Sequence, residues 1–449
     1  MSAINQYLEL FREHASVINA HAPASLNMRR EAAARVLEAL PRLPKAGDEG
    51  FECVSLEDMF APDYGINITR RKFDINPAEL NGCDLPNSGT FAASIVNDAF
   101  VADEKFASRL PRGVEVMSLI DAAAKYPEAI EKSVAPDTNP IVALNSLLVQ
   151  DGVYIRIDRN VVVEKPIQIL STFNTSEPLL AARRIIVDML EGAQATVLLC
   201  DHPRSRQADY LSCRVVEVRL SDNAQLDFYD LEESTERSRR ASVFAAEQQP
   251  YSALNAVGIT LSTATTRNEF HIAHRGPGIN TNLGGMVIAG GNEVVDNATY
   301  VVHSTPRCTS RQLFKYAMFD HSHGAFEGLV TVLPQATHTD AQQTNRNLLA
   351  SANAKMNAMP QLIIDCDEVK ASHGATTGQL DEAALFYMQQ RGIPQSEARM
   401  MLINAFMDEV LQRINHEPVR ERLRHLVDRR LRGCSAVCSN CSIDSLRKQ

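Results

Sequence analysis

The pattern of apolar and polar residues first predicts helices. Up to about residue 40, segments such as ASLNMRREAAARVLEAL place apolar residues at helical spacing and are rich in Ala, Leu, Glu and Arg. PRLPKAGDEG follows, and its prolines and glycines end the helix. Beyond it, SIVNDAFVA predicts a hairpin and SLIDAAAKYPEAIEK a helix. We therefore treat residues 1–140 as an N-terminal, mostly helical region.

Short strand-like segments dominate residues 141–380. RVVEVRL is typical of them, because Val216, Val218 and Leu220 alternate with a glutamate and an arginine. VYIRI, RIIVDML, ATVLLC, QLDFYDL, YVVH, GLVTVL and QLIIDC are similar, and polar turns separate several of them. The region is too long for one ordinary β-sandwich, whereas two sandwiches or one β-solenoid would fit it. No fixed repeat period decides between these two folds.

Helical spacing returns in residues 381–433. PQSEARMMLINAFMDEVLQRI begins with a proline, and its predicted inward stripe is Leu402, Phe406 and Val410. In EPVRERLRHLVDRRL the predicted inward stripe is Val419, Leu423, Leu426 and Val427. We interpret the arginines on the other side of this second helix as a solvated face: Arg420, Arg422, Arg424, Arg429 and Arg430. A glycine then ends the helix and is followed by a Cys-rich tail, residues 434–449.

Composition and charge argue against nucleic acid and membrane as partners of this protein. Lys and Arg number 45 against 55 Asp and Glu, and the resulting net charge of −10 repels a phosphate backbone. No apolar run approaches the ~18 residues that a membrane-spanning helix needs. The first residues include Glu9, Arg12 and Glu13, where a secretion signal requires an apolar core. We therefore expect a cytoplasmic protein that binds neither nucleic acid nor membrane.

Neither the cysteines nor the short motifs of the sequence indicate an active site. Six cysteines occur singly and are expected to be free thiols, which are usually small buried side chains: Cys53, Cys83, Cys200, Cys213, Cys308 and Cys366. The sequence has no phosphate-binding Gly-x-x-x-x-Gly-Lys loop, no nucleophile elbow and no complete dinucleotide fingerprint. His373 lies in SHGATTG, which is not a known zinc-binding or catalytic spacing.

The sequence around His373, ASHGATTGQLDEAALFYMQQRGI, closely resembles the SufB/SufD family of iron–sulfur cluster assembly proteins. The resemblance extends upstream through HSTPRCTSRQLFKYAMFDHSHGAFEGLVTVL and TDAQQTNRNLLAS, and downstream through GIPQSEARMMLINAFMDEVL. It is clear over about residues 300–412. Gly374 favours the SufD branch, because the SufB branch carries Glu at this position.

This resemblance implies a mainly β fold, a right-handed parallel β-helix core with N-terminal and C-terminal α-helical regions. It implies a non-enzymatic scaffold subunit that pairs with a SufB-like subunit and docks a SufC-like ATPase on its C-terminal helices. A transient iron–sulfur cluster would be built on this complex with sulfur from SufS and either SufE or SufU. A reduced flavin on the assembled complex is a further, open expectation.

Two alternatives accompany this interpretation. One is a self-pairing SufB/SufD-like scaffold. The other, from a different class, is a β-helix enzyme that acts on carbohydrate. The absence of tryptophan and of an obvious carboxylate pair argues against the enzyme.

The resemblance also gives His373 a role. In the family, the histidine of the Ser-His-Gly-Ala-Thr motif lies at the SufB–SufD interface and helps to hold the nascent cluster with a SufB cysteine. Imidazole is a weaker iron ligand than thiolate, which permits later release. The alternative is a histidine that only hydrogen-bonds at a strand end. Ala371 replaces the family's usual cysteine, so no thiol assists from that position.

Cys366 and Cys308 are weak candidates for the same site. Cys366 lies seven residues before His373, and an odd separation within a strand would place the two side chains on opposite faces. A shared site therefore needs a turn between them. Two further departures from the family pattern are Thr337-His338, where Gln-Lys is common, and DEGFECVSLEDMF, which replaces a Glu-x-Trp segment.

The tail contains three more cysteines, Cys434, Cys438 and Cys441. Their Cys-x3-Cys-x2-Cys spacing suits three corners of a [4Fe–4S] cluster and also marks radical-SAM enzymes. A radical-SAM enzyme is excluded because only eight residues follow Cys441. Two interpretations fit the spacing, a cluster or zinc site and a reduced tail without metal.

Overall fold

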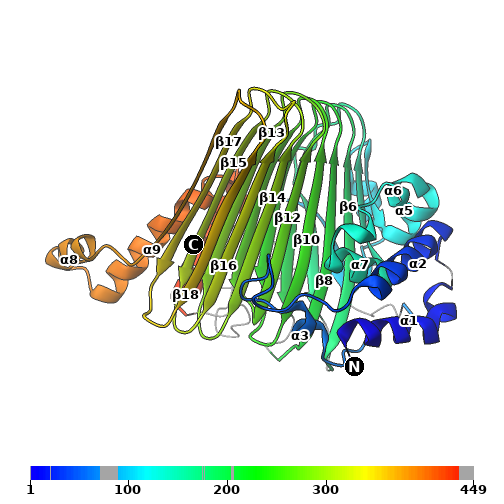
Figure 1. Cartoon of the computed structure of the whole chain (residues 1–449), viewed down its shortest axis with the longest axis horizontal. Helices are drawn as coiled ribbons and strands as arrows, with labels where there is room; N and C mark the ends of the chain where they lie inside the picture. Colours follow the sequence, from blue (N-terminus) through cyan, green and yellow to red (C-terminus); the bar gives the residue numbers. More distant parts are fainter. Residues whose placement is uncertain are drawn as a thin grey trace.

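The computed structural model describes residues 2–20, 22–70, 89–173, 175, 177–203 and 207–433. Within these ranges the chain forms a parallel β-solenoid, with helices at its N-terminal end and along one side (Figure 1). The β-helix core implied by the family resemblance is therefore confirmed, and the alternative of two sandwiches is wrong.

The predicted N-terminal elements are present. The two helices before residue 40 are α1 (Ala3–Ile18) and α2 (Ala24–Ala39), and the hairpin is β1 (Phe91–Val96) with β2 (Ala99–Val101). The helix predicted in SLIDAAAKYPEAIEK is divided in two at Pro127, which has no amide hydrogen to donate. The remaining elements of this region are α3 (Leu56–Phe60), α4 (Phe106–Arg109), β3 (Val114–Ser118), α5 (Leu119–Lys125), α6 (Pro127–Glu131), the 3-10 helix η2 (Pro136–Thr138) and α7 (Pro140–Leu148).

The strands of the solenoid alternate between two sheets. The first sheet contains β5 (Ile167–Phe173), β7 (Gln194–Pro203), β9 (Gln225–Glu233), β11 (Ala253–Ser262), β13 (Asn280–Ala289), β15 (Thr309–Met318), β17 (Asp340–Leu349) and β19 (Lys370–Gly378). The second contains β4 (Asp151–Ile157), β6 (Leu179–Met189), β8 (Tyr210–Leu220), β10 (Arg239–Gln248), β12 (Thr265–His274), β14 (Val294–His303), β16 (His323–Val332) and β18 (Lys355–Ile364). β1 pairs with β5 and β3 with β4, so earlier strands complete the first end of both sheets.

The length of a turn varies, which explains why the sequence shows no repeat period. Arg239 pairs with Thr265, whereas His323 pairs with Lys355, so the later turn is several residues longer. What recurs is a backbone conformation at one corner, where a residue with positive φ donates its amide to a carbonyl of the next turn: Asn160, Gly192, Asn223, Tyr251, Gly278, Arg307 and His338. Very different residue types fill this corner, so it leaves no sequence motif.

One part of the solenoid interior is apolar. Five phenylalanine rings follow one another with centroid separations of 4.9, 6.0, 5.9 and 4.8 Å: Phe228, Phe244, Phe270, Phe314 and Phe326. The predicted inward residues of RVVEVRL also lie in this interior core. Glu217, on the opposite face of that strand, is nevertheless buried because the N-terminal region covers the outer face of the second sheet. Its carboxylate accepts a hydrogen bond from Arg184 Nε at 2.6 Å.

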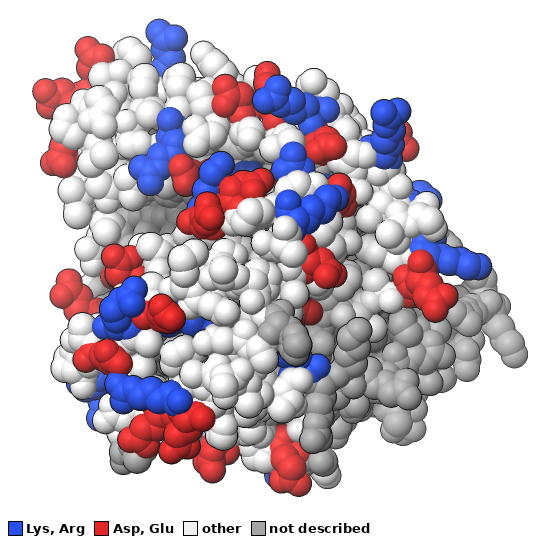
Figure 2. Space-filling model, turned by 90° about the vertical axis from the view of Figure 1, so that its right-hand side faces the viewer, with Lys and Arg blue, Asp and Glu red and all other residues white. Residues whose placement is uncertain are grey.

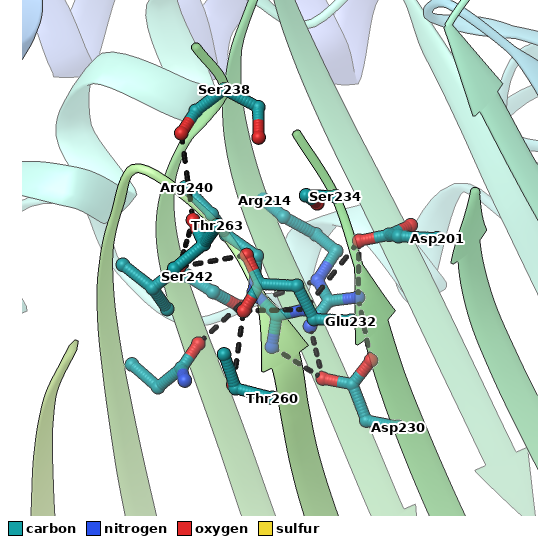
Figure 3. A network of polar contacts seen from close by, with 12 residues as sticks. Asp201, Arg214, Asp230, Glu232, Ser234, Ser238, Arg240, Ser242, Thr260 and Thr263 are labelled. Atoms are coloured by element: carbon teal, nitrogen blue, oxygen red, sulfur yellow. Dashed lines mark hydrogen bonds and ion pairs between the residues drawn. The ribbon is translucent and has the colours of Figure 1, made fainter. Parts of the chain in front are cut away.

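Another part of the interior contains a network of buried charges (Figure 3). Asp230 accepts hydrogen bonds from Arg214 and, at 2.8 Å, from Arg240. Asp201 lies 3.5 Å from both guanidinium groups, and Glu232 lies 3.7 Å from that of Arg240. Burial opposes the ionisation of Asp230, but the two arginines outweigh it and hold the pKa of this carboxyl below its usual value. The network therefore links β7, β8, β9 and β10 through paired charges.

The C-terminal helices are α8 (Glu382–Gln390), α9 (Gln395–Leu411) and α10 (Glu417–Leu431), and the last two cover the outer face of the first sheet. The inward stripe predicted for α10 is confirmed at all its positions. In α9, Val410 is buried, but the buried neighbours on its stripe are Ile403 and Met407 in place of the predicted Leu402 and Phe406.

The predicted solvated arginine face of α10 is wrong for two residues. Arg429 forms an ion pair with Glu233, and Arg430 forms one with Glu293 at 2.7 Å, both with largely buried carboxylates. These two arginines therefore fasten the last turn of α10 to the solenoid.

Two buried imidazoles face each other inside the solenoid. Nδ1 of His274 lies 3.2 Å from Nδ1 of His303, and the Nε2 atoms contact Thr281 Oγ1 at 2.8 Å and Ser310 Oγ at 2.9 Å, respectively. Thr281 donates its hydroxyl hydrogen to Gln248, so it accepts one from Nε2 of His274. Both rings are neutral, because burial lowers the pKa of His303 to about 4 and that of His274 well below its usual value.

We expect this pair to make the chain less stable in mild acid. The unfolded chain binds a proton on His303 near pH 6.5, whereas the folded chain binds it only near pH 4. The stabilisation is therefore complete above pH 6.5 and is lost as the pH falls to about 4, a change of about 3 kcal/mol. Urea unfolding in steps of pH should show a steeper loss for the wild type than for His303→Gln. Equal slopes would contradict the expectation.

Candidate functional site

The last turn of the solenoid, formed by β18 and β19, has no further strand beside it among the described residues. The outer edges of both strands therefore offer backbone amides and carbonyls for pairing. The opposite end is covered by the N-terminal helices (Figure 1), and that side of the molecule carries interspersed positive and negative side chains (Figure 2). One end of the solenoid is thus covered by helices, whereas the other, within the described residues, has free strand edges and is suited to binding another strand.

Apolar side chains are exposed at the uncovered end. Met359, Ile363 and Ile364 of β18 are 36%, 47% and 42% exposed. Beyond them, Phe386 and Tyr387 of α8 are 62% and 59% exposed, and α8 has no buried residue. Figure 1 shows α8 projecting past the last strands. Exposed apolar residues on these two elements are typical of interaction surfaces.

His373 lies in β19, in register with Gln343 of β17. Because side chains alternate along a strand, His373 points to the same side as Ala371, which packs against the interior core. Thr377 lies on this side too and accepts a hydrogen bond from Asn347. The imidazole therefore stands at the uncovered mouth of the interior, and it is exposed there. Neither ring nitrogen has a hydrogen-bond partner within the described residues.

The two single cysteines proposed for this site differ in position. Cys366 lies in the turn between β18 and β19, and its half-buried side chain packs against the interior core, as Ala371 does. The turn that a shared site with His373 requires is thus present. Cys308 is wholly buried before β15, two strands from β19 in the same sheet, and its thiol contacts the carbonyl oxygen of Gly276 at 3.4 Å. The structure does not bring Cys308 to the mouth.

The predicted cysteine site in the tail, Cys434, Cys438 and Cys441, lies outside the described residues. Among the residues that are described, no three His, Cys, Asp or Glu side chains form a group that could hold a metal ion. His373 therefore belongs to no such group within this part of the chain.

Two family models together match most of the chain. Residues 172–406 match the model for the SUF system FeS cluster assembly SufBD core domain, and residues 1–169 match the SufBD protein N-terminal region. The chain belongs to the SufBD family. The chain is similar to an iron–sulfur cluster assembly SufBD family protein of Synechocystis, with 27% identity over 437 residues, 94% of this chain and 95% of the relative.

Two relatives of this SufBD protein are named SufD. The Escherichia coli protein is 30% identical over 329 residues, and the Bacillus subtilis protein is 26% identical over 340 residues. Each alignment covers 72% of this chain and 75% of the relative. The predicted family and its link to iron–sulfur cluster assembly are therefore confirmed. In the described part of the chain, no helix combines the length and the apolar character needed to cross a membrane.

The segment in which this SufBD protein departs from the family's Glu-x-Trp pattern packs along the second sheet. The ring of Phe51 lies 4.3 Å from the buried guanidinium of Arg267, and Glu52 accepts a hydrogen bond from Asn357 of β18 at 3.4 Å. The N-terminal segment thus reaches the last turn. The other departure, His338, occupies the corner with positive φ.

Sequence analysis did not single out the exposed apolar residues of β18 and α8. A signal was available, because QLII and ALFY continue apolar residues through positions on both faces of their elements. A half-buried strand or helix would carry polar residues on its outer face. These uninterrupted apolar runs, next to the His373 motif in the sequence, therefore indicated that the outer faces of β18 and α8 are suited to binding another protein.

Proposed function

We propose that this SufBD protein is a non-enzymatic scaffold subunit for iron–sulfur cluster assembly that pairs with a SufB-like subunit through its last turn. The observation that supports this most is the uncovered edge of β18 and β19, beside exposed apolar residues and with His373 at its mouth. An edge of this kind binds a partner strand through backbone hydrogen bonds, while the apolar side chains fill its pockets. The pairing brings a second chain next to His373.

In this proposal His373 provides one nitrogen ligand to the cluster, which is the cargo of the complex. A thiolate of the SufB-like subunit provides another. A neutral imidazole binds iron less strongly than a thiolate, so the finished cluster is released to an acceptor. The tail cysteines, the sulfur donors SufS with SufE or SufU, a reduced flavin on the complex and a cytoplasmic location stay predictions.

Co-purification tests the pairing. The double variant Met359→Lys with Ile363→Lys places charges on the exposed side of β18 and should abolish recovery of a co-expressed SufB-like subunit. The matched control is Met28→Lys on α2, where the side chain is 59% exposed at the other end of the molecule. Undiminished recovery with the double variant would contradict the proposal. A dimer of this chain alone that persists beside the SufB-like subunit would favour the self-pairing scaffold.

Docking of a SufC-like ATPase should depend on α8. The variant Phe386→Ser with Tyr387→Ser removes two exposed rings from a helix without buried residues, so the fold should be retained while ATPase co-purification is lost. Deleting residues 382–449 is a poorer test, because it also removes the helices that cover the first sheet. Met28→Ser is the control. ATPase retained on the double variant would show that the docking surface lies elsewhere.

A further inference from the structure

Gln343 of β17 is paired with the candidate ligand across two neighbouring strands. It is the register partner of His373 on the neighbouring strand, and its side chain is 1% exposed. Parallel strands lie about 4.8 Å apart, and register partners project to the same side. The same two strands show that such partners reach each other on this face, because Asn347 Nδ2 donates to Thr377 Oγ1 at 3.2 Å.

Packing fixes the side-chain amide of Gln343, but in the described part of the chain only its nitrogen has hydrogen-bond partners. Its Nε2 lies 3.4 Å from Thr299 Oγ1 and 3.4 Å from Gln312 Oε1, both in the preceding turn. A Cβ atom at Gly328 would lie 2.1 Å from this Nε2, so the glycine on the facing strand leaves room for the amide where it now lies. The Oε1 atom is buried and has no hydrogen-bond partner among the described residues. A buried acceptor in this state destabilises the fold, because it has lost its hydrogen bonds to water without gaining another.

We propose that Gln343 is a positioning residue for His373, whose ring donates one N–H to Gln343 Oε1 and thereby presents its other nitrogen to iron. This inference rests on the proposed function of His373. The proposed hydrogen bond would give a partner to both side chains. Within the described residues, the imidazole of His373 has no hydrogen-bond partner and Oε1 of Gln343 has no donor. A ligating imidazole is generally oriented in this way, since the hydrogen bond at one nitrogen selects which nitrogen binds the metal.

The test uses the complex of this chain with SufB-like and SufC-like subunits, loaded anaerobically with ferrous iron and sulfide. Gln343→Met keeps the length of the side chain but removes the acceptor, so we expect cluster yield to fall about tenfold or more. Gln343→Glu keeps an acceptor and should restore most of the yield. Asn345→Leu is the matched control, because it removes another buried amide of β17 whose register partner is Ala375.

Two further measurements separate positioning from stability. The pH at which cluster loading is half-maximal should shift with Gln343→Met and stay unchanged with Asn345→Leu. Pulsed electron paramagnetic resonance of the reduced cluster, with 15N-labelled histidine, should show an altered imidazole coupling in Gln343→Met and a wild-type coupling in Asn345→Leu.

The outcomes distinguish the two proposals. If His373→Ala lowers the yield but Gln343→Met leaves yield, pH dependence and coupling unchanged, the inference about Gln343 is overturned and the role of His373 stands. If His373→Ala has no effect on the yield, both are overturned. Loss of yield in Gln343→Met without recovery in Gln343→Glu, at an unchanged coupling, would show that the amide is merely structural.

Discussion

Replacing His373 with alanine should leave the complex with a SufB-like subunit assembled but lower the cluster formed on it by about tenfold or more. Assembly should survive because one exposed side chain contributes little to an interface made along two strand edges. Cluster yield should fall because residue 371 is alanine, so no thiol there can take over the ligand position. Iron and sulfide on the purified complex, together with its mass, measure both effects.

Two variants make this result specific. His373→Cys should restore part of the yield, since thiolate is a competent iron ligand, but should slow transfer to an acceptor apoprotein. His338→Asn is the control, because it removes an exposed histidine from a corner whose positive φ asparagine tolerates. A complex of His373→Ala that falls apart would make the residue structural. A complex that builds clusters at the normal rate would refute the ligand role.

The interior charges should matter more for stability than any surface pair. Asp230→Ala leaves the buried guanidinium groups of Arg214 and Arg240 without their shared carboxylate, and removing one partner of such a network costs about 3–5 kcal/mol. The shift of the urea unfolding midpoint measures this. Asp103→Ala is the matched control, because it removes a carboxylate from an exposed pair with Arg109 and should cost less than about 1 kcal/mol. Equal losses would mean that the interior network is not stabilising.

The helical parts of the fold were predictable from local spacing. In α10 the apolar residues lie along the buried stripe, so the sequence pattern allowed only one choice of buried face. In α9, MMLINAFM is apolar nearly all round, and the solenoid selected Ile403 and Met407 over Leu402 and Phe406. Tertiary contacts therefore decided a choice that the sequence left equivalent.

The solenoid itself was predicted from family resemblance and not from periodicity, for two physical reasons. Its recurring corner requires a backbone conformation that Asn, Gly, Tyr, Arg and His all adopt here. In addition, polar residues within its strands do not mark an exposed face, since Arg214 and Asp230 are paired with each other inside. Alternation of polar and apolar residues identifies two faces of a strand but not which face meets water.

The candidate site was predictable only in part. The family motif identified His373, whereas its place at the mouth of the interior follows from the end of the strand order at β19. Gln343 could not be recognised because its importance depends on pairing between β17 and β19, which are separated in the sequence by two short turns and by β18. The spacing of residues along the chain contains no information about that register.

Among the strands of the solenoid, β18 and β19 at the uncovered end are the last to leave the ribosome. The N-terminal helices and first strands can fold while the rest is being translated, and each completed turn then offers a template for the one that follows. α9 and α10 lie against strands made long before them, including β9 and β15. They can therefore take their final place only on a chain whose turns are already built. α8 follows β19 in the chain, so the order of synthesis delays its surface, and with it the proposed binding of the ATPase, until every strand of the solenoid has been made.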